Sequence, residues 1–66
     1  MKYQDMLAKA SDVKAAYYVD ILNAVVYESR LAADQRRAAR SVLSNWRLTT
    51  VEEDAIFNEA CRIMQA

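Results

Sequence analysis

The sequence predicts an all-α fold, either a small three-helix bundle or a bent helical hairpin with one long, widely apolar helix. Two observations support this prediction. The 66 residues include no glycine and no proline, the residues that supply left-handed turns and stop helices. Apolar residues also recur at helical spacing along most of the chain. We therefore expect a single domain over residues 1–66, with short connections between antiparallel neighbours.

The first predicted helix covers about residues 3–30, with a possible break near residues 11–12. Ser11 or Asp12 can cap a new helix start, because their side chains accept hydrogen bonds from backbone N–H groups. The alternative is one continuous helix with both side chains on its solvent face. We favour a short first helix, or a frayed start, that leads into a long one.

The second predicted helix covers about residues 33–47. Asp34 lies where a cap or a first-turn acid stabilises a helix start. We expect the helix to end near Asn45, since asparagine often replaces glycine in a left-handed helix terminus. Trp46 is expected to anchor the core between the second and third helices. The predicted buried stripe consists of Ala39, Val42, Leu43 and Trp46.

The third predicted helix covers about residues 50–65 and has the best start signal in the chain. Two overlapping capping boxes are available, Thr49 with Glu52 and Thr50 with Glu53. The acidic first turn also complements the positive end of the helix dipole. The predicted buried stripe consists of Ile56, Phe57, Ala60, Ile63 and Met64.

The composition offers little for catalysis. The chain has no histidine and a single cysteine, so it cannot assemble a zinc site of the usual nitrogen and sulfur type by itself. We expect Cys61 to be a buried structural thiol, since no histidine is available to activate it. The sequence therefore predicts a non-enzymatic protein without catalytic residues, metal, cofactor or small-molecule substrate.

No segment has the length and apolarity of a membrane span. The most apolar stretch, residues 13–27, contains Lys14, Asp20 and Asn23, whereas a span needs roughly 20 apolar residues. The N-terminus lacks the apolar run of a signal peptide, and a lone free cysteine suits a reducing compartment. We expect a cytoplasmic protein without a membrane partner.

The long first helix carries more apolar surface than two short neighbours are expected to cover, because its apolar residues surround most of its circumference. One interpretation is that this helix is the central helix of the bundle and that its apolar surface is buried within the monomer. The other is an interface with a second copy or a larger protein, to which tyrosines contribute both area and a polar tip. The predicted interface residues are Tyr17, Tyr18, Leu22, Val25, Val26 and Tyr27.

The charges are segregated although the net charge is zero. Residues 34–47 carry +3 and residues 48–66 carry −3. The predicted basic face of the second helix consists of Arg36, Arg37, Arg40 and Arg47, and the predicted acidic face of the third consists of Glu52, Glu53, Asp54 and Glu59. The arginines can form a solvated helix face or salt bridges to these acids, contact a protein, or bind nucleic acid phosphates. The acids can be solvated caps or can contact a basic groove on a partner.

The function that we expect is that of a protein–protein interaction module, a small inhibitor or adaptor that occupies a partner surface and also self-associates. The alternative is a small dimeric nucleic-acid-binding regulator that presents the arginine face of the second helix. Against that alternative, the chain is not basic overall and lacks the glycine-containing turn typical of helix-turn-helix proteins.

Overall fold

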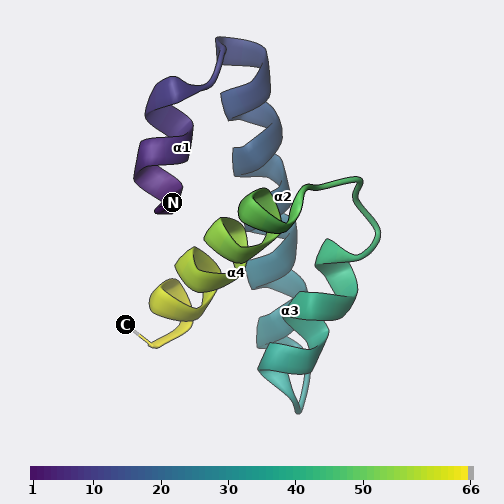
Figure 1. Cartoon of the computed structure of the whole chain (residues 1–66). Coiled ribbons are helices and arrows are strands. Elements are labelled where there is room, and N and C mark those ends of the chain that lie inside the picture. The colour runs from purple at the N-terminus through teal and green to yellow at the C-terminus, as the bar shows by residue number, and fades with distance from the viewer. Residues whose placement is uncertain (66) are drawn as a thin grey trace.

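A computed structural model describes residues 1–65, and these residues form four helices and no strand (Figure 1). The helices are α1 (Tyr3–Lys9), α2 (Asp12–Arg30), α3 (Gln35–Leu43) and α4 (Thr50–Gln65). The all-α prediction is confirmed. The expected number of three helices is wrong, because the segment over residues 3–30 forms two helices rather than one.

The break between α1 and α2 lies at Ala10 and Ser11, which both have extended backbone conformations. The Ser11 hydroxyl accepts a hydrogen bond from the Lys14 backbone N–H at 3.2 Å. Ser11 therefore caps α2 and satisfies one of the N–H groups that a helix start leaves without an intrahelical partner. The prediction of a short helix followed by a long one is confirmed, with Ser11 rather than Asp12 as the cap.

Helix α3 is shorter than predicted and ends at Leu43. Its start is as expected, because the Asp34 carboxylate accepts a hydrogen bond from the Arg37 N–H at 3.1 Å. The predicted left-handed terminus at Asn45 is wrong, since no residue in the described part of the chain has a positive φ angle. Instead, the N–H groups of Asn45 and Trp46 bond to carbonyls three residues earlier, which tightens the last turn without a left-handed residue.

Helix α4 begins with a reciprocal capping box. The Thr49 N–H donates to the Glu52 carboxylate at 2.8 Å, and the Glu52 N–H donates to the Thr49 hydroxyl at 3.2 Å. The first of the two predicted boxes is therefore confirmed. The alternative between Thr50 and Glu53 is not formed, because the Glu53 carboxylate points to Arg40 on α3.

Helix α2 is the centre of the fold, and α1, α3 and α4 all contact it (Figure 1). Helix α4 also contacts α1 and α3, so the buried side of α2 has three neighbours. Ile21, Val25, Leu43 and Ile56 have fully buried side chains, each of which contributes about 1.5–3 kcal/mol of burial free energy. The core consists of Tyr3, Met6, Tyr18, Ile21, Leu22, Val25, Val26, Ala39, Leu43, Ala55, Ile56 and Ala60.

Candidate functional site

Most of the interface predicted on the long helix belongs to the core instead. Tyr18, Leu22, Val25 and Val26 are buried, because α3 and α4 pack against α2, with a smaller contact from α1. Their packing in the core leaves these four side chains little surface for a partner, and of them Val26 lines a surface hollow. Of the predicted set, Tyr17 is half-buried and Tyr27 is exposed.

The opposite side of α2 is uncovered and carries large apolar side chains. Val13, Tyr27 and Leu31 are 83%, 65% and 70% exposed, and Leu31 continues the helical backbone as the C-terminal cap residue. Side chains three and four positions apart lie on one helix face. We define the outer face of α2 as the row Val13, Tyr17, Asp20, Ala24, Tyr27 and Leu31, which has spacings of four and three residues in alternation.

Aromatic side chains and two shallow hollows flank the outer face. The Tyr17 and Trp46 rings meet edge to face with centroids 5.6 Å apart, so Trp46, which is partly buried against the core, also contacts α2. A hollow of about 500 Å³ lies beside Tyr27 and Leu31 and is bounded by Ile63 of α4. A second hollow of about 420 Å³ lies between Ala24 and Trp46.

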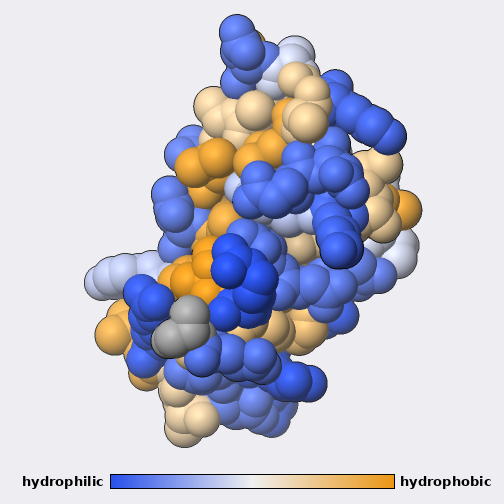
Figure 2. All heavy atoms as spheres, turned by 90° about the vertical axis from the view of Figure 1, so that its left-hand side faces the viewer, coloured by the Kyte–Doolittle hydropathy of each residue, from blue (hydrophilic) through white to orange (hydrophobic). Residues whose placement is uncertain are grey.

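A different face of the molecule, formed by α1 and the C-terminal half of α4, has another character. Figure 2 shows this face as largely hydrophilic, with apolar side chains in narrow strips between polar ones. Two large side chains of α1, Tyr3 and Met6, are buried against the core. The outer face of α2 differs in presenting three large exposed apolar residues, Val13, Tyr27 and Leu31, whereas the face formed by α1 and α4 presents Met1.

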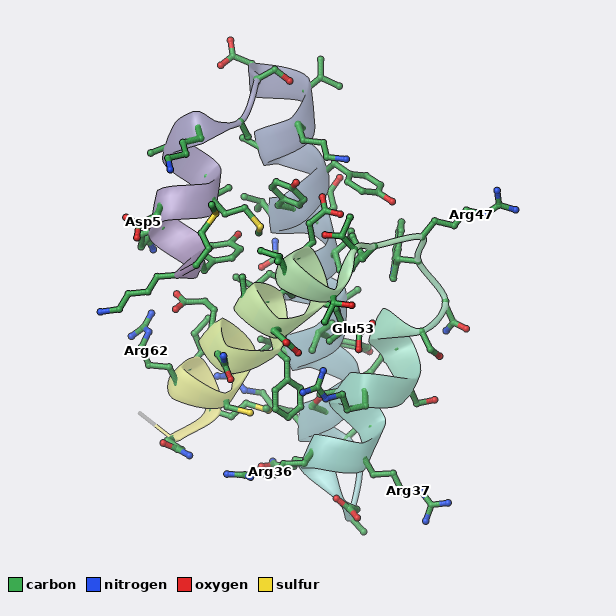
Figure 3. All side chains as sticks on the ribbon, viewed as in Figure 1. Asp5, Arg36, Arg37, Arg47, Glu53 and Arg62 are labelled. Atoms are coloured by element: carbon green, nitrogen blue, oxygen red, sulfur yellow. The ribbon has the colours of Figure 1, made fainter. Side chains whose placement is uncertain are left out.

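The predicted arginine face is dispersed. Because α3 ends at Leu43, Arg47 lies on the connection to α4 and not on the helix. Figure 3 shows Arg36 and Arg37 at one end of α3 and Arg47 far from them, with the three side chains pointing in different directions. Residues 1–65 provide no ion pair for these three arginines.

Arg40 is held against the surface of α4. Its guanidinium lies 3.1 Å from the Glu53 carboxylate and 3.1 Å from the Asp54 carboxylate. It also stacks on the Phe57 ring, with 3.9 Å between the guanidinium carbon and the ring centroid. The salt-bridge interpretation of the basic face is therefore confirmed for Arg40.

The predicted acidic face is likewise engaged within the chain. Glu53 and Asp54 bind Arg40. Glu59 accepts two hydrogen bonds from the Arg62 guanidinium, at 2.7 and 2.9 Å, and these bonds hold the pKa of the Glu59 carboxyl below its ordinary value. Arginines of the same chain thus already pair with three of the four acids that could attract a basic protein.

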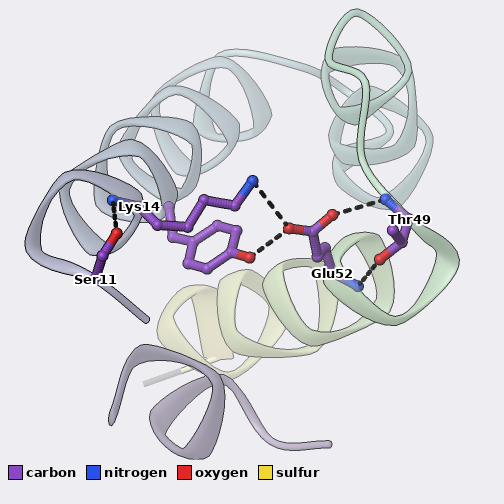
Figure 4. A network of polar contacts seen from close by, with 5 residues as sticks. Ser11, Lys14, Thr49 and Glu52 are labelled. Carbon is purple, nitrogen blue, oxygen red and sulfur yellow. Dashed lines mark hydrogen bonds and ion pairs between the residues drawn. The ribbon is translucent and has the colours of Figure 1, made fainter. Parts of the chain in front are cut away.

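Glu52 is the fourth predicted acid and joins α2 to α4 (Figure 4). The Tyr18 hydroxyl donates a hydrogen bond to its carboxylate, and the Lys14 ammonium lies 3.6 Å from it. The bonds from Tyr18 and Thr49 hold the pKa of the Glu52 carboxyl below its ordinary value. Burial, followed by the bond to Glu52, raises the pKa of Tyr18 to about 12. All these contacts join α2 to the start of α4, so we interpret the network as structural.

The remaining candidates for chemistry are sparse. Cys61 is half-buried rather than buried as predicted. Among residues 1–65, no three or more cysteine, aspartate and glutamate side chains are grouped so that they could hold a metal ion. None of the four described helices combines the length and apolarity that crossing a membrane requires.

Comparison with known protein families, with curated proteins and with solved structures gave no match for this chain. The surface of the chain itself is therefore the guide to its function. Val13 and Leu31 were not predicted as surface residues. Their signal was present in the alternating spacing of the row from Val13 to Leu31, which is the spacing of a helix–helix seam.

Proposed function

We propose that this protein is a non-enzymatic protein–protein interaction module, a small inhibitor or adaptor that acts by occupying a partner surface. The outer face of α2 is the proposed contact surface. The observation that carries the proposal is the concentration of exposed apolar side chains on that face, with Tyr27 and Leu31 each about two-thirds exposed.

Physical chemistry favours covering this face. Removing apolar area from water is favourable by about 25 cal/mol per Å², and an exposed apolar helix face is the element that helix-in-groove recognition uses. Tyrosine is enriched among the residues that dominate binding energy, and this face presents both Tyr17 and Tyr27. Charged residues border it, among them Asp12, Glu28 and Arg30, as in interfaces with an apolar centre and a polar rim.

Photo-crosslinking tests the proposal in the native host. A photoreactive benzoylphenylalanine is introduced in place of Tyr27, and in a matched control in place of Val51, an exposed apolar residue of α4. We expect light-dependent adducts from position 27, with a second copy or with another host protein, and few from position 51. Equal adducts from both positions, or none from position 27, would contradict the proposal.

A nucleic-acid-binding role is the second candidate, favoured by the exposed guanidinium groups of Arg36, Arg37 and Arg47. The support for this role is weaker, because Glu53 and Asp54 neutralise Arg40, which lies on α3 beside Arg36 and Arg37. Arg36→Glu combined with Arg37→Glu tests it in a filter-binding assay at several salt concentrations. A loss of salt-dependent retention would favour this role, and unchanged retention would exclude it.

A further inference from the structure

We infer that the outer face of α2 binds the same face of a second copy of this chain, with the two α2 helices antiparallel. This inference rests on the proposed function and names one partner for that surface. It is carried by three properties of the face, which are its spacing, its symmetry about one position and the placement of its charges.

The spacing is that of a coiled-coil seam. Two helices pack side by side when apolar residues alternate at intervals of three and four. The outer face follows this rule from Val13 to Leu31 with one polar interruption, Asp20. The row spans about 27 Å at 1.5 Å per residue, which is nearly the whole length of α2.

The row is also symmetric about position 22, which suits a two-fold interface. In such an interface the same two positions meet twice, because each copy presents the same surface. An antiparallel pair centred on this position brings Val13 of one copy opposite Leu31 of the other. Tyr17 then meets Tyr27, and Asp20 meets the small side chain of Ala24. Trp46 already restrains the Tyr17 ring through their edge-to-face contact, which reduces the ordering needed on binding.

Charge placement favours the antiparallel orientation over the parallel one. A parallel pair in register would bring the two Asp20 carboxylates together in one layer, where like charges repel. In the antiparallel pair each carboxylate faces Ala24 and lies near Asn23, whose amide group can donate a hydrogen bond. Lys14 and Glu28 lie on the same flank of the row. The antiparallel pair therefore brings Glu28 of one copy toward Lys14 of the other, whose ammonium lies 3.6 Å from Glu52 of its own copy, and this contact occurs twice across the interface.

The size of the outer face sets the expected affinity of the dimer. Stable interfaces bury at least about 1,200 Å² in total, or about 600 Å² per copy, compared with the 4550 Å² accessible surface of this chain. The outer face is one row of six residues on a single helix, so we expect the area that it buries to lie at or below this lower limit. We therefore expect a reversible dimer with a dissociation constant in the micromolar range.

Sedimentation of the purified full chain at a series of concentrations tests the inference. We expect the mass to rise from the 7.5 kDa monomer to twice that value. Tyr27→Asp is expected to raise the dissociation constant about 100-fold, and Glu28→Lys about fivefold. Asp20→Ala is expected to lower it about tenfold, because a charge leaves the buried seam. Val51→Asp, at an exposed apolar position of α4, is the matched control and leaves the constant unchanged.

Crosslinking in a Cys61→Ser background tests the orientation. Proteins carrying Val13→Cys or Leu31→Cys are treated with a short bis-maleimide, separately and as a mixture. We expect dimers mainly in the mixture, because the antiparallel pair brings position 13 of one copy to position 31 of the other. Efficient crosslinking of Val13→Cys to itself would overturn the antiparallel assignment.

The inference and the proposed function fail in different ways. The dimer would be excluded if the wild type stayed monomeric at all concentrations and the Asp20→Ala variant did as well. If position 27 still crosslinks to another host protein, the proposed function stands without the dimer. If position 27 crosslinks to no protein at all, both are wrong. Circular dichroism confirms that each variant keeps its helices, which we expect because all substituted positions on the outer face are at least partly exposed.

Discussion

The Tyr18 hydroxyl donates a hydrogen bond to the Glu52 carboxylate and so joins the middle of the chain's central helix to the first turn of α4. The same carboxylate accepts the Thr49 N–H bond of the capping box. One side chain therefore fixes both the start of α4 and its position against α2. In a small domain without a disulfide, a polar joint of this kind contributes a substantial part of the stability.

Removing the Tyr18 hydroxyl is expected to destabilise the fold. Tyr18→Phe keeps the buried ring but removes the hydrogen bond to the Glu52 carboxylate, and a bond to a charged group is worth about 1.5–3 kcal/mol. We expect the free energy of unfolding in urea to fall by an amount in this range. Tyr27→Phe is the matched control on the exposed side of the same helix, and we expect its effect to be below about 0.5 kcal/mol. Equal effects of the two substitutions would contradict this account.

The same joint predicts a loss of stability in acid. The folded pKa of the Glu52 carboxyl lies below its ordinary value of 4.5, so its contribution is complete above that pH. It is lost as the pH falls through the folded pKa. The difference in unfolding free energy between the wild type and Glu52→Gln is therefore expected to shrink in acid. Asp5→Asn, at an exposed position of α1, is the control, and we expect it to change the unfolding free energy by less than about 0.5 kcal/mol.

At alkaline pH the same joint is expected to lose stability as the pH rises, the opposite of its dependence in acid. The pKa of Tyr18 is raised from 10.0 to about 12 in the fold, so the neutral phenol is favoured when the chain is folded. Its contribution is complete below pH 10.0 and is lost as the pH rises toward 12. We expect the stability advantage of the wild type over Tyr18→Phe to disappear in this window. A constant difference across it, measured by urea unfolding, would show that the phenol does not titrate with folding.

Local signals in the sequence predicted the helix starts but not the buried faces. Ser11, Asp34 and Thr49 each cap a helix through a bond to a backbone group three residues away, and such short-range chemistry is readable from neighbouring residues. The end of α3 was missed, because turns with bonds to carbonyls three residues earlier need no marker residue such as glycine.

The inner and outer sides of α2 could not be separated from the sequence. Its circumference is apolar nearly all round, so helical periodicity alone does not indicate which side faces the core. Contacts with α1, α3 and α4 decide that Val25 is buried while Val13 is exposed. This is why the predicted interface contained four core residues. The arginines looked clustered for another reason, because the predicted second helix extended to Arg47 whereas α3 ends at Leu43.

Ser29→Ala is expected to stabilise the protein. The Ser29 side chain is fully buried, and its hydroxyl has no hydrogen-bond partner within residues 1–65. Substitution by alanine removes a desolvated polar group and improves helix propensity, for an expected gain of about 1 kcal/mol. Ser41→Ala, at an exposed position of α3, serves as a control for propensity alone and is expected to give a few tenths of a kcal/mol. A loss of stability in Ser29→Ala, measured by thermal unfolding, would refute this interpretation.

Arg40→Ala is expected to cost about 1 kcal/mol of unfolding free energy, although the Arg40 side chain is exposed. Single surface ion pairs contribute little, but this guanidinium contacts two carboxylates and also stacks on Phe57. Arg37→Ala on the same helix is the matched control, and its expected effect is below about 0.5 kcal/mol. Arg40→Lys separates the contributions, because it keeps the charge and loses the planar stacking group. If stacking matters, Arg40→Lys is destabilised even at high salt, where screening has weakened the ion pairs; a variant as stable as the wild type there would leave only the ion pairs as the cause.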